Sequence, residues 1–180
     1  MNNTNRKKIE YLIEKNARLF NLKLTNKKQN IFTIWEDYHL STGIENEIFH
    51  WDLQMTIGIT KNGLIHMMMF MHPLVVTDKT KTSFIEFANA ANLWLESSLG
   101  RFWVNSDNDF CYETYLPELF VEYSQELEQQ LFDKPFSHFK DCLSPLMMLK
   151  DEKWTAEKAI EYLNRLREDG FVDNSEYGLW

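Results

Sequence analysis

Histidine and aspartate residues in two neighbouring predicted strands are the residues in this sequence best suited to chemistry. His50 and Asp52 lie two apart in one strand, and His66 and His72 lie six apart in the next. Imidazole and carboxylate groups can bind a metal ion or act as general acid and base. Six residues of strand span about 20 Å, so His66 and His72 cannot share one ion. The strand register predicted below also puts the first pair on the opposite side of the sheet from the second, and we therefore expect no metal site.

Two further groups of reactive residues are better explained by ordinary structure. Ser106, Asp107 and Asp109 resemble part of a calcium loop, but the glycine and the distal glutamate of an EF-hand loop are missing. We expect a hairpin turn there. Cys111 and Cys142 are far apart in the sequence and form no spaced pair, which indicates two buried thiols in a reducing compartment rather than a disulfide or a zinc site.

Asn89 and Asn92 lie three residues apart on a predicted helix. Such side chains can hydrogen-bond a ligand, but they more often bind backbone groups or a neighbouring strand. The sequence contains no glycine-rich phosphate loop and no GxSxG, CxxC or HExxH motif. We therefore expect no catalytic residue, no cofactor and no enzymatic activity.

The Asn62-Gly63 pair between two apolar runs is the strongest turn signal in the sequence. A two-residue loop of type I′ requires a positive φ at both residues, which asparagine and glycine tolerate. This loop would pair Ile57 with Met68. Apolar and polar residues alternate along residues 49–60, so one face of the hairpin should be core, and the register predicts that Met68 belongs to that core face.

A second row of apolar residues falls on the other face of the same hairpin in this register. It lies opposite polar residues and one glycine, so that face is only half apolar. Methionine side chains adapt to varied surfaces, which is typical of sites that accept more than one partner. We therefore predict a partner-binding surface made of Ile65, Met67, Met69, Met71, Thr56 and Gln54. The alternative, which the sequence leaves open, is that the C-terminal helices cover this row.

Helices are predicted before and after these strands in the sequence. Apolar residues recur at spacings of three and four between residues 6 and 22 and between residues 84 and 95, which predicts two amphipathic helices. A third helix should be interrupted at Pro135. A last helix should begin after Thr155 and end near Gly170.

The order of these elements is typical of an α+β fold. We expect an antiparallel sheet of about five strands in the order α-β-β-β-α-β-β-α, with an added C-terminal helix. Residues 1–150 would form one α+β domain with a basic N-terminal helix, and residues 151–180 would form the added helix and a tail.

The distribution of charge limits the kinds of partner. The chain has a net charge of -8, but residues 1–28 carry eight Lys or Arg and only two Glu. The remaining body is strongly acidic and should repel nucleic acid phosphate. We expect the basic first helix to pack on that acidic body, and we expect neither nucleic-acid nor membrane binding. The charged N-terminal residues and the lack of an apolar stretch of about 18 residues favour a cytoplasmic protein.

The central elements resemble a known family in their order and residue types. The hairpin MTIGITKNGLIHMMMF, the helix FIEFANAANLWL and the segment LGRFWVNSDNDFCYETYL are similar to YbjN-like proteins, over about residues 31–149. The fold of that family is the fold of the class I chaperones of type III secretion. The resemblance implies a small acidic cytoplasmic protein that binds another polypeptide, often as a homodimer, without a cofactor. The break at Pro135 and the segment 154–180 depart from the family pattern.

These observations favour a non-enzymatic module, chaperone-like or a regulatory adaptor, that binds a polypeptide through an apolar sheet or helix surface. We expect a homodimer, because a small two-layer α+β sheet has a face or an edge to cover. The alternative is a small-ligand-binding protein or a hydrolytic enzyme, which would require polar groups that converge in a concave apolar pocket.

Overall fold

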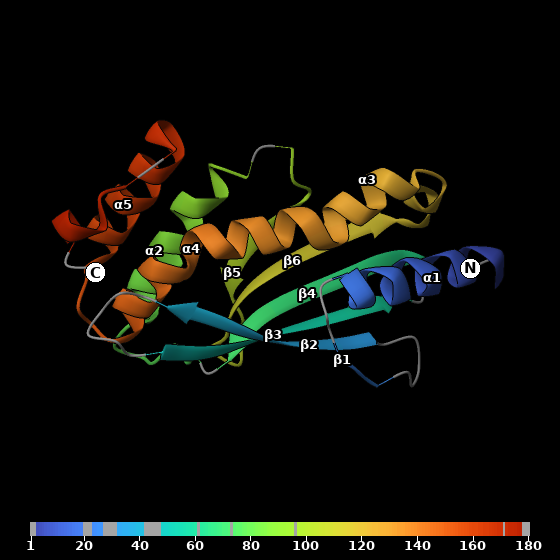
Figure 1. The fold of residues 1–180 in the computed structure, drawn as a ribbon, viewed down its shortest axis with the longest axis horizontal. Coiled ribbons are helices and arrows are strands. Elements are labelled where there is room, and N and C mark those ends of the chain that lie inside the picture. Colours follow the sequence, from blue (N-terminus) through green and yellow to red (C-terminus); the bar gives the residue numbers. More distant parts are fainter. Residues whose placement is uncertain are drawn as a thin grey trace.

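The computed structural model has a single sheet with its helices gathered on one face (Figure 1). It describes residues 3–19, 23–26, 32–41, 48–60, 62–72, 74–95, 97–170 and 172–177. The strands are β1 (Lys23–Asn26), β2 (Phe32–Ser41), β3 (Ile48–Ile59), β4 (Leu64–His72), β5 (Gly100–Val104) and β6 (Phe110–Pro117). The α-helices are α1 (Asn3–Leu19), α2 (Lys81–Asn92), α3 (Ser124–Glu128), α4 (Lys134–Lys150) and α5 (Ala156–Asp169). Short helical turns are η2 (Glu118–Glu122), η3 (Gln129–Asp133) and η4 (Asn174–Tyr177).

The predicted α+β class with one antiparallel sheet is confirmed. Among the described residues the sheet has six strands in the order β1-β2-β3-β4-β6-β5, so the predicted count of five misses β1. β1 is only four residues long, and its pairing with β2 is irregular between Leu24 and Asn26. A segment this short carries no alternation that would mark it as a strand. No described helix is long and apolar enough to cross a membrane.

The turn between β3 and β4 has a three-residue loop rather than the predicted two-residue loop. The Thr60 N–H donates to the Leu64 C=O at 2.9 Å, and the Gly63 N–H donates to the Thr60 C=O at 3.1 Å. Gly63 has a φ of 75°, whereas Asn62 does not have the positive φ that a type I′ turn requires of it. A three-residue loop that ends on a left-handed residue is the next most common way to close a hairpin.

The longer loop shifts the register of the hairpin by one residue. Ile57 pairs with Met67, not with Met68 as predicted. Because side chains alternate along a strand, a shift by one residue moves every side chain of β4 to the other face of the sheet. The predicted faces of β3 are correct, since Met55 and Ile57 are buried, and the predicted faces of β4 are wrong.

The four apolar residues of the predicted partner surface are therefore core residues. The exposed fraction is 2% or less for Ile65, Met67, Met69 and Met71. They share the face of Met55 and Ile57, which the helices cover (Figure 1). The prediction of an exposed methionine row was wrong, and the alternative, in which helices of the same chain cover it, is correct. Gln54 and Thr56, the polar residues of the predicted surface, lie half-buried on the opposite face.

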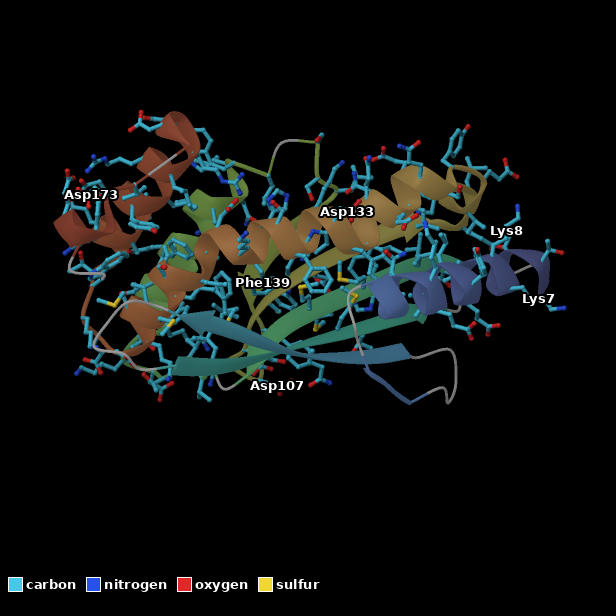
Figure 2. The ribbon with its side chains drawn as sticks, viewed as in Figure 1. Lys7, Lys8, Asp107, Asp133, Phe139 and Asp173 are labelled. Atoms are coloured by element: carbon cyan, nitrogen blue, oxygen red, sulfur yellow. The ribbon has the colours of Figure 1, made fainter. Side chains whose placement is uncertain are left out.

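Aromatic side chains fill the space between α4 and the sheet. Phe139 of α4 (Figure 2) meets Phe102 edge-on, with 5.2 Å between ring centroids, and lies 6.3 Å from Phe110. Phe84 and Phe87 of α2 pack on the same Phe110 ring. Tilted and edge-on contacts of this kind are the favoured geometries of aromatic pairs. The core thus joins α2 and α4 to the β5–β6 hairpin.

The helix that was predicted to break at Pro135 runs on instead. α3, η3 and α4 follow one another directly, and Gln129, Asp133 and Lys134 keep right-handed helical dihedrals where these segments meet. η3 is a π-helical turn, and Pro135 lies just after it in the first turn of α4. The π-helical turn already departs from the hydrogen-bond pattern of an α-helix, so the missing N–H of Pro135 is absorbed there without a break.

The last helix begins and ends where the sequence predicts. The Thr155 hydroxyl accepts a hydrogen bond from the Lys158 N–H at 3.3 Å, and Gly170 takes a φ of 68° at the other end. α5 packs on α2 and α4, and its residues Ala159 and Leu163 are buried there. The division of the chain at residue 150 stays a prediction.

The side chain of Asn92 closes the free edge of β5. Its Oδ1 accepts from the Phe102 N–H at 2.7 Å, and its Nδ2 donates to the Phe102 C=O at 2.9 Å. The amide takes the place that another strand would occupy, which protects an edge strand from unwanted pairing. This confirms the prediction that Asn92 binds a neighbouring strand, whereas Asn89 is exposed.

Replacing Asn92 with alanine should lower the free energy of unfolding by about 1 to 3 kcal/mol, because two backbone groups of Phe102 lose their partner. The matched control is Asn89→Ala on the same helix, which should stay within about 0.5 kcal/mol of the wild type. Urea unfolding followed by circular dichroism measures both changes. Equal effects of the two substitutions would contradict this role of Asn92.

Met67 and Met68 are adjacent in the sequence but lie on opposite faces of the sheet, so they test the register. Met67→Ala should lower the free energy of unfolding by about 2 to 5 kcal/mol, because it leaves a cavity in the core. Met68→Ala should lower it by about 1 kcal/mol, since Met68 is only half-buried. If chemical denaturation shows the larger loss for Met68→Ala, the hairpin has the register of a two-residue loop.

Candidate functional site

The face of the sheet away from the helices, which we call the open face, combines hydrogen-bonding and apolar side chains. Figure 1 shows no described helix on this side of the sheet. Strand pairing assigns to it Gln54, Thr56, Gly58, His66, Met68, Phe70, Arg101, Trp103, Cys111, Glu113 and Tyr115. Most of these residues are half-buried, because neighbouring side chains shield one another across the strands.

Glu113 of β6, the strand beside the edge strand β5, contacts three other side chains on the open face. The Tyr115 hydroxyl donates to Glu113 Oε1 at 2.9 Å, and His66 Nε2 lies 2.9 Å from the same oxygen. Arg101 Nη2 of β5 lies 3.8 Å from Oε2. Glu113 is only 6% exposed although no described helix covers it, because these three side chains enclose its carboxyl group.

Two ring contacts hold the partners of Glu113 in place. The rings of His66 and Tyr115 stack with centroids 4.4 Å apart and an interplanar angle of 8°. The Arg101 guanidinium lies 5.7 Å from the centroid of the Trp103 ring. Burial, together with the hydrogen bond to Glu113 and the charge of Glu113, raises the pKa of Tyr115. The phenol therefore stays protonated at neutral pH and remains a hydrogen-bond donor.

Apolar side chains border this network on the open face. Met68 of β4 pairs with Glu113, and Phe70 pairs with Cys111 one row further along. Trp103 of β5 pairs with the other side of Cys111. The open face thus carries a group of apolar side chains directly beside the polar network. We call Met68, Phe70 and Trp103 the apolar row.

The two cysteines are buried thiols, as the sequence predicts. Burial raises the pKa of Cys111 to about 12, with smaller contributions from Glu113 and Asp109. Burial also raises the pKa of Cys142 in the helix-side core. Neither thiol is a nucleophile at neutral pH, because the reactive form is the thiolate.

The loop predicted to be a hairpin turn rather than a calcium loop is a turn. Asn105 Oδ1 accepts from the N–H groups of Asp107 at 2.9 Å and Asp109 at 2.8 Å. Asn108 has a φ of 64°, and its N–H donates to the Asn105 C=O at 3.2 Å. In the part of the chain whose side chains the structure describes, no group of three or more His, Cys, Asp or Glu could hold a metal ion.

The corrected register changes the face assigned to two histidines. His66 pairs with Gly58, and His72 pairs with Asp52. Both histidines therefore belong to the open face, which is also the face of His50 and Asp52. The prediction that these two pairs lie on opposite sides of the sheet was wrong.

The sequence patterns identified Gln54 and Thr56 of the open face but not Glu113. Glu113 is the one charged residue in the strand FCYETYLP of β6. A lone carboxyl group among aromatic and apolar residues is a signal that such a strand has a polar contact to make. Its partners could not be named, because Arg101 and His66 lie on two different strands.

A second polar cluster is buried between α4 and α5, on the helix side of the sheet. His138 Nδ1 lies 3.3 Å from Nη2 of Arg167, which also forms an ion pair with Asp141. Burial, together with the positive charges of Arg167 and Lys134, lowers the pKa of His138 to about 4. The other ring nitrogen, Nε2, is buried and has no hydrogen-bond partner among the described residues. A histidine with so low a pKa is a weak general base at neutral pH.

A groove of about 630 Å³ lies beside α1, between this helix and the segment formed by η2 and α3. The exposed Lys7 and Lys8 line it and extend into solvent (Figure 2). Lys15 pairs with Glu128 of α3 across the groove at 2.9 Å. These contacts confirm the prediction that the basic first helix packs on the acidic body.

A scan against models of known protein families finds no match, and a search of curated proteins finds no similar protein. The resemblance to YbjN-like proteins, and the functions that it implies, therefore remain proposals.

Stability should depend on pH through His138. Its folded-state pKa of about 4 lies below the ordinary value of 6.5, so the unfolded chain binds the proton more readily between these values. The contribution of His138 to the free energy of unfolding is complete above pH 6.5 and is lost as the pH falls to about 4. This loss is at most about 3 kcal/mol.

Urea unfolding between pH 4 and 7.5 measures this effect. The free energy of unfolding should fall less toward low pH for His138→Gln than for the wild type. His66→Gln is the control and should show the same fall as the wild type. If the free energy of unfolding depends on pH in the same way in the wild type and in His138→Gln, His138 is not buried in its neutral form.

Proposed function

We propose that the protein is a non-enzymatic binding module, chaperone-like or a regulatory adaptor, that holds a polypeptide on the open face of its sheet. The observation that carries this proposal is the pairing of an apolar row with a fixed hydrogen-bonding network on a face over which no described helix lies. Gln54 and Thr56 remain part of this surface. The methionine row is replaced by Met68 and Phe70, because the corrected register puts these two residues outside the core.

The side chains of the open face fit the needs of a bound peptide segment. Met68, Phe70 and Trp103 offer apolar contacts, and methionine adapts to side chains of different shape. Tyr115 and Arg101 are exposed at the edges of this row, and both are residue types common at the centres of protein interfaces. The indole Nε1 of Trp103 is buried and has no acceptor within the part of the chain that the structure describes, so a carbonyl of a bound segment could satisfy it.

The charge of the protein favours one kind of partner. With a net charge of -8, the protein should attract apolar segments with basic flanks and repel nucleic acid. The resemblance to YbjN-like proteins supports the same class of function and adds the homodimer and the cytoplasmic location to the proposal.

The alternative is a hydrolytic enzyme that uses the His66–Glu113 pair. The contact of 2.9 Å between His66 Nε2 and Glu113 Oε1 is an arrangement in which a carboxyl group orients an imidazole for general base catalysis. An enzyme also requires a concave site around such a pair. Neither the groove beside α1 nor the smaller one beside α5 contains His66 or Glu113, and we therefore place this function second.

Selection from a random-peptide phage library on the immobilised protein tests the proposal. Synthetic copies of the selected peptides are then titrated by fluorescence anisotropy against the wild type and two variants. Met68→Asp puts a charge beside Glu113 on the open face and should weaken binding by at least about tenfold. Ile85→Asp is the matched control, because Ile85 is exposed on α2, and it should leave binding unchanged.

Two outcomes would contradict the proposal. One is that no peptide is selected, and the other is that Met68→Asp binds the selected peptides as the wild type does. Hydrolysis of chromogenic esters that disappears in His66→Gln would favour the enzymatic alternative.

A further inference from the structure

The groove beside α1 lies between two chain segments that contact each other near both of its ends. Asn5 Nδ2 of α1 donates to Glu118 Oε1 of η2 at 2.9 Å, and Lys15 Nζ of α1 pairs with Glu128 of α3 at 2.9 Å. Both contacts join residues that are 113 apart in the sequence, so the two segments run side by side in the same direction. The groove volume of about 630 Å³ is within the range of small-ligand sites.

The lining residues of α1 form two rows along the helix. Thr4, Lys8 and Leu12 follow one another at a spacing of four residues, and so do Lys7, Tyr11 and Lys15. This spacing puts the members of each row on one side of the helix. The groove therefore extends over three turns of α1, or about 16 Å.

Apolar side chains form the middle of the groove. Leu12 of α1 and Val121 of η2 line it and are buried. Tyr11 lines it next to Leu12 and keeps 66% of its surface exposed. A large aromatic side chain in solvent offers apolar area that a ligand gains free energy by covering.

Two lysines carry unpaired charge in the groove. Lys7 and Lys8 are exposed at the same end of α1 (Figure 2). Among the described side chains neither of them has an ion-pair partner, whereas Lys15 at the other end pairs with Glu128. Glu122 lines the opposite wall, so the charges that stay unpaired are two positive and one negative. In a protein with a net charge of -8, this groove is a place that attracts an anion.

We propose that the groove beside α1 binds one amphipathic anion, a fatty acid with an alkyl chain of medium length. The carboxylate lies between Lys7 and Lys8, where charge-assisted hydrogen bonds can form. The alkyl chain extends along α1 over Leu12, Val121 and the ring of Tyr11. Charge thus selects the head of the ligand, and the apolar middle of the groove selects its body.

A single ligand molecule suits this site better than a membrane surface does. A helix that lies in a membrane interface must present its apolar face to the lipid, but Ile9, Leu12 and Ile13 of α1 are buried in the protein. The groove residues are also distinct from those of the open face. The site is therefore independent of the proposed polypeptide binding, and either can be present without the other.

Isothermal titration with decanoate, with decanol as the uncharged ligand of the same chain length, tests the proposal. The wild type should bind one decanoate per chain. Decanol should bind at least about tenfold more weakly, and so should decanoate to the variant with both Lys7→Gln and Lys8→Gln, because hydrogen bonds to a charged group are lost in each case. Glu122→Gln should strengthen binding of decanoate by about two- to fivefold, since it removes a like charge.

Two controls locate the ligand. The variant with both Lys140→Gln and Lys153→Gln has the same change in net charge, and both of these exposed lysines lie outside the groove. Met68→Asp changes the open face instead. Both control variants should bind decanoate as the wild type does, and the variant with both Lys7→Gln and Lys8→Gln should bind the peptides selected on the open face as the wild type does.

Four results would overturn the assignment. The first is that decanoate shows no saturable binding up to about 1 mM. The second is that decanol binds as tightly as decanoate, and the third is that the two lysine double variants behave alike. The fourth is that the protein sediments with vesicles of phosphatidylglycerol, because the groove would then serve a lipid surface rather than a single fatty acid.

Discussion

The length of the loop between β3 and β4 decides which residues form the core and which form the open face. Gly63 adopts a φ of 75°, which residues with a side chain rarely adopt, and this allows a three-residue loop. A loop shorter by one residue would exchange the two faces of β4, so that Met68 would lie under the helices and Met67 would lie on the open face. The polar network depends on the same choice, because His66 contacts Glu113 only when both belong to the open face.

The two faces of β3 could be predicted from the sequence, but those of β4 could not. Polar and apolar residues alternate along β3, whereas LIHMMMFMH of β4 is apolar at positions of both parities. Only the turn could choose the register, and an Asn-Gly pair is compatible with loops of two or three residues. The hairpin of β5 and β6 is closed in the same way, because Asn108 takes the left-handed position of another three-residue loop. Glu113 could not be placed, because β6 pairs with β4 across two intervening elements.

Amide side chains from the helices satisfy the backbone where the sheet ends at β5. Gln130 in the π-helical turn accepts from the Leu99 N–H at 2.9 Å and donates to the Ser97 C=O at 2.8 Å. Asn92 does the same for both groups of Phe102. These hydrogen bonds leave few backbone groups there to pair with an added strand. A polypeptide partner is therefore better accommodated on the open face than at this edge.

Stability alone does not account for the polar network around Glu113 on the open face. Enclosing a carboxyl group with charged partners has a desolvation cost, and such groups are often no more stabilising than apolar residues of similar volume. Met68 and Phe70 show that apolar residues fit on the same face. A bound polypeptide has different needs, because its backbone N–H and C=O groups require hydrogen-bond partners while its apolar side chains are being buried. Glu113, with Tyr115 and His66 held around it, supplies fixed polar groups beside the apolar row, and this combination is what such a partner requires.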